Sequence, residues 1–325
     1  MELYLIRHGE TVDNVAGLYA GVRDSALTNY GHDQANRLGQ HFAKSNVRFT
    51  HIFSSPLHRA AKTAEAIKLC QRDDGRAENL CNAVDITKVP ELIEQDFGYY
   101  EGKPFHARSN PKRSGREAHR DQHKDEPGFQ DVESKESMDS RADKFLDGHL
   151  LPLFEKDGAA PFVVGIVSHG MLLSHLWRRL LLRLPPKSVS VDPEVTAAKG
   201  SIILQHLGGW SNTGYLELAF DRAAKSEVPQ AFSLPATSKQ DPTDLVQTAT
   251  ATTSSEGMPA SATNSEASTS HDMPQMLNGW SILICAIDRK DHLIGLKRQR
   301  GGIGSSAHDK GHKKLDGFFK RQRTS

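Results

Sequence analysis

The sequence predicts an α/β protein, a three-layer α/β/α sandwich with a mostly parallel, mixed central sheet, followed by a disordered linker and a basic C-terminal tail. Over roughly the first 220 residues, short apolar runs alternate with segments of helical periodicity, which is typical of a parallel sheet covered by helices. Three of the apolar runs lead directly into serine, arginine or histidine, at the strand ends where such sheets bind ligands. These runs are Glu2–Ile6, Phe49–Phe53 and Pro161–Val167.

Four segments around these strands have the periodicity of helices. In Asn29–Asn46, the side chains of Ala35, Leu38 and Phe42 recur on one face, and Thr28 stands before the segment as an N-cap. The other predicted helices are Leu57–Leu69, Met138–Phe154 and Met171–Leu182.

Two hairpins are also predicted. Ser201–Leu207 and Tyr215–Phe220 are expected to pair around Gly208 and Gly209. Trp280–Leu296 is apolar enough for a second, small hairpin, with its turn at residues 288–291.

The composition divides the chain into three parts. Residues 1–222 are predicted to form the catalytic domain. Residues 223–275 are rich in Ser, Thr, Ala and Pro, and we expect a disordered linker because few apolar side chains offset the entropy of ordering. Residues 276–325 form the basic tail that contains the second hairpin.

Cysteine usage and hydropathy exclude several classes of protein. Cys70, Cys81 and Cys285 form no CxxC pair, so neither a structural zinc site nor a disulfide framework is expected, and a reducing compartment fits best. No apolar run approaches the length that spans a membrane. The N-terminal residues have neither a basic flank nor a cleavage site, so no secretory leader is expected. The predicted location is cytoplasmic, with a nuclear location left open.

Two histidines and two arginines indicate phosphate chemistry. Arg7 and His8 follow the first strand, His169 follows the third, and Arg59 lies after the second. A phosphoryl group carries about two negative charges, which guanidinium groups neutralise well. A neutral imidazole is also a competent nucleophile that splits one displacement into two.

No metal or other cofactor is expected, because the remaining histidines lack the spacing of metal ligands. Taken singly, His8 and His169 would be ordinary strand-end histidines, and Arg59 would be the partner of a helix carboxylate. It is the combination that favours phosphate chemistry.

Five sequence blocks, in a fixed order over roughly residues 1–220, make the pattern specific. They are Leu5–Thr11 with Asn14, Leu27–Gly31, Ser54–Ala64, Glu91–Gly102 and Val167–Gly170. This ordered set resembles the phosphoglycerate mutase-like family, branch 1 of the histidine phosphatase superfamily.

The resemblance implies a role for each site residue. His8 is the residue that is phosphorylated, and Arg7, Arg59 and His169 grip the phosphate. The phosphate cage, which is the set of groups around the phosphate, is completed by Asn14, by Gly21 and by the backbone at Gly170. Glu94 stands at the position of the general acid, whereas Glu101, a rival carboxylate, matches a structural element.

Hydrolysis, mutase chemistry and binding without catalysis are the three functions to compare. Mutases of the family carry a basic residue directly after the acid, but Gln95 and Asp96 follow Glu94 here, which favours hydrolysis. A pure binding module would not need all of the catalytic residues that the sequence retains. The expected substrate is a small phosphorylated metabolite; sugar phosphates, phosphoglycerates and nucleotides all remain open. Lys112, Arg113 and Arg116 either contact its anionic end or belong to a solvated loop.

The tail suggests a separate partner. Arg289–Ser325 contains eleven Lys and Arg against three Asp and Glu, although the whole chain has a net charge of +1. His312, Leu315, Phe318 and Phe319 resemble a sliding-clamp-binding PIP-box, with histidine in place of the usual glutamine. The alternatives are that the same side chains dock on the enzyme itself or that the tail is disordered. The basic runs at 297–300 and 320–323 would suit nuclear import.

Overall fold

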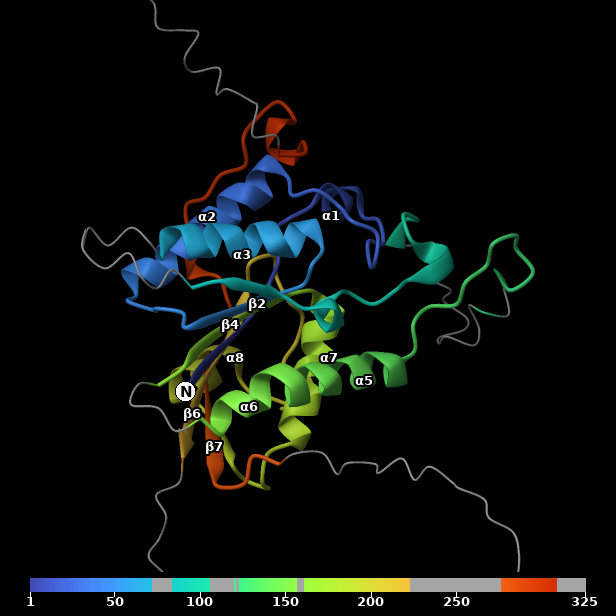
Figure 1. Cartoon of the computed structure of the whole chain (residues 1–325). Coiled ribbons are helices and arrows are strands. Elements are labelled where there is room, and N and C mark those ends of the chain that lie inside the picture. The colour runs from blue at the N-terminus through green and yellow to red at the C-terminus, as the bar shows by residue number, and fades with distance from the viewer. Residues whose placement is uncertain (72–83, 106–119, 121–122, 157–160, 223–275, 309–325) are drawn as a thin grey trace, which may run out of the picture. The chain divides into compact units, whose positions relative to one another are not determined.

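The structure is a computed structural model that describes residues 1–71, 84–105, 120, 123–156, 161–222 and 276–308. Its centre is a seven-stranded mixed sheet in the order β3-β2-β4-β1-β6-β7-β5 (Figure 1). The strands are β1 Glu2–Arg7, β2 His51–Ser54, β3 Ile86–Lys88, β4 Val163–Ser168, β5 Val189–Val191, β6 Tyr215–Arg222 and β7 Trp280–Arg289. Strands β3, β2, β4 and β1 are parallel, β6 is antiparallel to both β1 and β7, and β5 runs parallel to β7. The predicted α/β class is confirmed.

The helices follow the amphipathic segments of the sequence. They are α1 Val12–Ala16, α2 Asn29–Lys44, α3 His58–Cys70, α5 Lys135–Phe145, α6 Leu151–Phe154, α7 Gly170–Leu182 and α8 Pro193–Lys199. Single 3₁₀ turns lie at Pro90–Leu92, Gly98–Tyr100, Asp291–Leu293 and Ile303–Ser305, and a π turn at Leu146–Leu150 joins α5 to α6. The predicted N-cap of α2 is confirmed, because the Thr28 hydroxyl accepts a hydrogen bond from the Gly31 N–H at 2.9 Å.

The period of two along β1 divides the core between the two faces of the sheet. Leu3 and Leu5 pack with the apolar side chains of α5, α6 and α7, whereas Tyr4 and Ile6 pack with those of α2 and α3. All four side chains are at most 2% exposed. Figure 1 shows α2 and α3 on one side of the sheet and α5, α6 and α7 on the other. These are the three layers that the sequence predicted.

The hairpin predicted between residues 201–207 and 215–220 is wrong. Residues 201–207 form no strand and contain only an isolated bridge between Ile203 and His206. Strand β6 pairs instead with β1 and β7, which lie on either side of it. Both partners are remote in sequence, so a local pattern of apolar residues could not reveal them.

The separate C-terminal hairpin is also wrong, and so is the boundary that excluded residues 276–308 from the catalytic domain. Trp280–Arg289 is one strand, β7, placed inside the sheet between β6 and β5. Ile282 and Ile284 are at most 1% exposed and belong to the same core as β1. The segment therefore completes the sheet, and its alternating apolar side chains are buried in the main core on one face of that sheet.

Several predictions concern residues outside the described ranges. The linker at 223–275, the basic residues at 112–116 and the clamp-binding motif at 312–319 are among them. Within the described ranges, Cys70 and Cys285 are half-buried, and their thiols lie near the carbonyl oxygens of Asn36 and Leu283. No helix in that part of the chain is long and apolar enough to cross a membrane.

Candidate active site

Three strand ends meet at one edge of the sheet. Strands β2, β4 and β1 are adjacent and parallel, with Arg7 in register with Ser168 and Ser54 in register with Val167. His8 and His169 follow β1 and β4, and their rings lie 5.0 Å apart between centroids. The predicted convergence of these strand ends is confirmed.

His8 is held as a neutral imidazole with a free lone pair. Its Nδ1 lies 2.7 Å from the carbonyl oxygen of Gly9, and a carbonyl only accepts, so Nδ1 carries the hydrogen. The lone pair is then on Nε2. Burial, followed by the positive charges of Arg59 and Arg7, lowers the pKa of His8 well below 6.5. The ring is 4% exposed and is therefore a nucleophile that requires no deprotonation near neutral pH.

His169 has the opposite tautomer. Its Nδ1 accepts a hydrogen bond from Arg59 Nε at 3.2 Å, and its Nε2 therefore carries the hydrogen, which it donates to the Ser55 hydroxyl at 2.9 Å. Burial and the neighbouring Arg59, His8 and Arg7 lower the pKa of His169 well below 6.5. Ser55 thus fixes the orientation of the second histidine, a role that the sequence did not reveal.

Arg59 is 1% exposed and binds the backbone of the loop at residues 20–23. It donates to the carbonyl oxygens of Ala20, Gly21 and Arg23 at 3.1, 2.7 and 2.8 Å. Its guanidinium therefore brings positive charge to His169 while most of its N–H groups bind backbone. The structure brings Arg59 and Gly21 together, as the sequence predicted.

Gly21 does not present its own amide as a phosphate donor. Its N–H is directed at the carboxylate of Glu101, 3.1 and 3.0 Å from the two oxygens. Glu101 also accepts from the N–H groups of Val22 and Phe97 at 3.1 and 3.0 Å. The carboxylate orders this loop, which leaves no N–H of Gly21 for a ligand. Its expected part in the cage is corrected on this ground.

Arg7 supplies an unused donor to the site. Its Nη1 donates to the Trp210 carbonyl at 2.6 Å, but its buried Nε has no partner among the described residues. That nitrogen lies 3.9 Å from the place where a Cβ on Gly170 would stand. Burial lowers the pKa of the guanidinium. A buried N–H without a partner is costly, and a bound anion would satisfy it.

Glu94 lies at the N-terminus of α7. Its Oε1 accepts from the Leu172 N–H at 3.1 Å and its Oε2 from the Met171 N–H at 3.2 Å. The N-cap residue, His169, makes no side-chain cap of its own, so Glu94 satisfies orphan N–H groups of the helix. No described partner takes the N–H of Gly170, the first residue of α7. A contact between this amide and phosphate stays a prediction.

A loop before β6 binds the backbone at the end of β1. The Asn212 side-chain amide donates to the His8 carbonyl at 3.2 Å and to Asn14 Oδ1 at 3.1 Å. The Thr213 N–H lies 3.1 Å from the Arg7 carbonyl oxygen and 3.2 Å from that of His8. Asn14 is thus in the site, as predicted, with its NH₂ group not used by these bonds. The loop itself was not found from the sequence, which placed a hairpin turn there.

A glycine permits the close packing of this region. The Gly9 N–H donates to Thr63 Oγ1 on α3 at 3.0 Å, and Thr63 in turn donates to the Arg59 carbonyl at 2.8 Å. A Cβ on Gly9 would collide with the Gly31 carbonyl on α2. Within the described residues, no three His, Cys, Asp or Glu side chains gather as metal ligands would.

Comparisons with known proteins agree with this geometry. Residues 3–215 match the family model of the histidine phosphatase superfamily, branch 1. A probable phosphatase of Schizosaccharomyces pombe is 30% identical over 63% of this chain and 65% of its own length. The fructose-2,6-bisphosphatase TIGAR of Xenopus laevis is 41% identical over 32% of this chain and 34% of its own. The chain thus spans less than two thirds of either relative.

A solved mycobacterial hydrolase has the same fold. It is 22% identical and covers 69% of this chain and 92% of its own, with a TM-score of 0.50. A probable phosphoglycerate mutase of Erwinia tasmaniensis is 32% identical over 56% of this chain and 75% of its own. The matched region contains both site histidines, both site arginines and Glu94. The chain therefore belongs to branch 1 of the histidine phosphatase superfamily.

Proposed function

We propose that the protein hydrolyses a small phosphate monoester through a phosphohistidine on His8, without a metal ion. The observation that carries the proposal is the state of His8: a buried neutral ring whose Nδ1–H is held by Gly9, leaving the Nε2 lone pair for attack. The unpartnered Nε of Arg7 supports it, because a buried donor beside a nucleophile suits an incoming oxyanion.

In the first step, His8 Nε2 attacks phosphorus. The N–P bond forms as the bond between phosphorus and the leaving oxygen breaks, and Glu94 gives its proton to the departing alkoxide. Arg7, the NH₂ group of Asn14 and the N–H of Gly170 stabilise the charge on the transferred oxygens. Arg59 contributes its positive charge and holds His169 in position.

In the second step, water attacks the phosphohistidine. Glu94, now ionised, accepts a proton from the water, the N–P bond breaks, and the electron pair returns to His8 Nε2. The products are the dephosphorylated metabolite and orthophosphate, and both catalytic groups return to their starting states. Gln95 and Asp96, in place of a basic residue after the acid, favour water over a second substrate as the acceptor.

The test is turnover of p-nitrophenyl phosphate in the presence of a chelator, together with acid-labile phosphate labelling of the protein. His8→Ala is expected to abolish both, whereas His206→Ala, on an exposed loop, should leave both unchanged. Normal labelling of the His8→Ala protein would refute the phosphohistidine. Release of the label only when a second phosphate acceptor is added would identify a mutase instead. Absence of any turnover or labelling in the unmodified protein would favour a binding module.

A further inference from the structure

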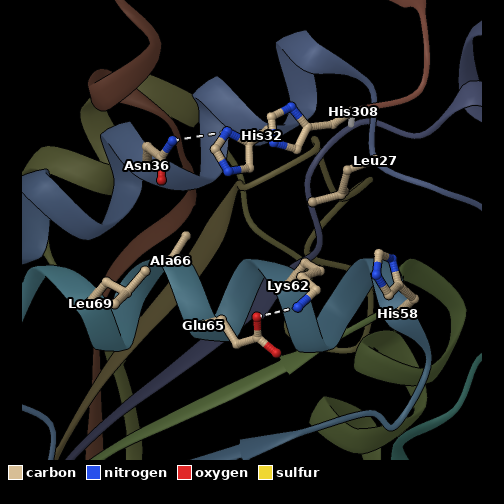
Figure 2. A pocket seen from close by; sticks show the side chains of 9 residues that line it. All are labelled: Leu27, His32, Asn36, His58, Lys62, Glu65, Ala66, Leu69 and His308. Carbon is tan, nitrogen blue, oxygen red and sulfur yellow. Dashed lines mark hydrogen bonds and ion pairs between the residues drawn. The ribbon is translucent and has the colours of Figure 1, made fainter. Parts of the chain in front are cut away.

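The chain beyond β7 runs along α2 and returns to the loop that follows β1, residues 8–11. Figure 1 shows this segment leaving β7 and passing along α2 toward its N-terminal end. Arg37 on α2 donates to the Ile294 carbonyl at 3.0 Å, and the Asn29 N–H donates to the Ser306 carbonyl at 3.0 Å. The segment's last described residue, His308, stacks on His32 with ring centroids 3.8 Å apart. Figure 2 shows this stacked pair at the rim of a groove of about 470 Å³ that side chains of α2 and α3 also line.

Arg298 in this segment pairs with Glu10. Its Nη1 donates to Glu10 Oε1 at 2.7 Å, and its Nη2 donates to Glu10 Oε2. The guanidinium also lies over the ring of Tyr30, 4.5 Å from its centroid, and donates to the Ser305 hydroxyl at 3.1 Å. Two parallel bonds between guanidinium and carboxylate fix direction as well as distance. The pair is therefore a geometric constraint on Glu10.

Glu10 is two residues from His8 and belongs to the same loop. Its carbonyl accepts from the Thr28 N–H at 2.9 Å, its N–H donates to Gln34 Oε1 at 2.9 Å, and its Oε1 also accepts from the Thr28 hydroxyl at 2.9 Å. Thr28 and Gln34 thus bind the backbone of Glu10, and Arg298 supplies the positive charge that pairs with its carboxylate. A displacement of Glu10 would be transmitted through Gly9, whose carbonyl fixes the tautomer of His8.

The other side of His8 is held from the end of β7. Asp288 accepts hydrogen bonds from the N–H and the hydroxyl of Ser211, both at 2.7 Å. The residues next to Ser211 bind the catalytic strand: the Trp210 carbonyl accepts from Arg7, and Asn212 donates to the His8 carbonyl. His292, beyond β7, lies 2.9 Å from the Thr213 hydroxyl and completes this support.

We propose that Arg298, acting on Glu10, and Asp288, acting on Ser211, are positioning residues that set His8 for attack on phosphorus. The inference rests on the proposed function, and it assigns a catalytic purpose to a part of the chain that lies outside the family match at residues 3–215. A misplacement of about 1 Å at the reacting centre lowers a rate by as much as about a hundredfold, so constraints at two sides of one residue have a measurable effect.

The first experiment compares variants of the full-length protein. In Arg298→Gln we expect kcat for p-nitrophenyl phosphate and the single-turnover rate of phosphoenzyme formation to fall about tenfold or more, with KM within about twofold. Arg298→Lys should recover part of the loss, because it restores the charge but not the paired bonds. Arg300→Gln, at an exposed position two residues away, is the control and should behave as the unmodified protein. Asp288→Asn should lower kcat in the same manner.

A double-mutant cycle tests the route. If Arg298 acts through Glu10, the effect of Arg298→Gln should largely disappear in a Glu10→Gln background. A loss of the same size in both backgrounds would overturn the assignment. So would a rate that falls only in proportion to the fraction of folded protein, measured by thermal unfolding at the assay temperature.

Amide hydrogen exchange separates this inference from the proposed function. Exchange of the backbone at residues 8–11 should be faster in Arg298→Gln than in Arg300→Gln, whether or not the protein turns over a substrate. If the unmodified protein shows no phosphatase activity but the exchange difference is present, the proposed chemistry fails and the positioning of the loop stands. Equal exchange in the two variants would overturn the positioning role.

Discussion

The carboxylate of Glu94 accepts a hydrogen bond from the Leu172 N–H at 3.1 Å, so the proposed proton donor is also a cap of α7. The helix that begins at the second histidine is thereby joined to the loop that carries the acid. Glu94 thus has two roles, to cap α7 and, as proposed, to donate a proton, and an experiment can separate them.

The first prediction separates them. Glu94→Gln keeps an acceptor oxygen for α7 but has no acidic proton, so hydrolysis of alkyl phosphates should slow by about a hundred- to ten-thousand-fold. Turnover of p-nitrophenyl phosphate should fall much less, because its phenolate needs little protonation. The comparison is kcat for the two substrates, with Asp96→Asn as the neighbouring control. An equal loss for both substrates would show that Glu94 positions phosphate, and Glu101 would be the next carboxylate to test.

The second prediction concerns stability against pH. The folded pKa values of His8 and His169 lie well below 6.5, and each returns toward 6.5 on unfolding. At pH values between the folded and the unfolded pKa, the two histidines are protonated in the unfolded chain but neutral in the folded protein. The free energy of unfolding should therefore fall as pH drops below about 6.5, with a slope approaching about 2.7 kcal/mol per pH unit from this pair.

Urea unfolding between pH 7.5 and pH 5 would measure that slope. Burial also lowers the pKa of His41, His51 and His292, that of His292 to about 4, so these residues add to the total. The double variant with asparagine at positions 8 and 169 isolates the contribution of the two site histidines. A slope unchanged in that variant would contradict the prediction.

The third prediction tests the place of β7 in the domain. Ile284 is fully buried in the main core, so Ile284→Ala should reduce the free energy of unfolding by about 2–5 kcal/mol. Ile294→Ala, at a side chain 77% exposed, should change it by no more than about 0.5 kcal/mol. A chain that ends at Arg222 should show no cooperative unfolding transition. A truncated chain with the unfolding midpoint of the intact protein would restore the boundary at residue 222.

The fourth prediction concerns the clamp-binding motif, which stays a hypothesis from sequence. A peptide of residues Lys310–Ser325 should bind a sliding-clamp protein, with Leu315, Phe318 and Phe319 as its apolar anchor. Titration calorimetry would measure the affinity, and the peptide with alanine at positions 318 and 319 is the control. No measurable binding by the unmodified peptide would leave docking on the enzyme or disorder as the alternatives.

The strand ends and the side chains that follow them were predictable because each motif directly follows an apolar run. Nothing beyond the local pattern is needed to place His8 or His169 at the end of a strand. Strands β3 and β5 were missed for the opposite reason, since they are three-residue strands with exposed or half-buried side chains. Such short segments at the ends of the sheet carry almost no periodic signal.

The residues that hold the site were harder to find. Trp210 acts through its carbonyl group, which any residue type possesses, so the sequence contains no sign of its role. Arg298 stands in a basic run that would suit nuclear import, and only tertiary structure separates it from Lys297 and Arg300. Its partner, Glu10, is at the other end of the chain. Long-range ion pairs of this kind leave no trace in local spacing.

The place of β7 also affects how the protein is made. A ribosome completes β6 long before it synthesises the strand that covers its far side, with residues 223–279 in between. Until then, β6 presents an open edge, with unpaired N–H and C=O groups that can bind another nascent chain. The sheet therefore stays incomplete, and Ser211 lacks its partner Asp288, until β7 has been synthesised. We expect the yield of the protein to depend strongly on chaperones that protect the growing chain during this delay.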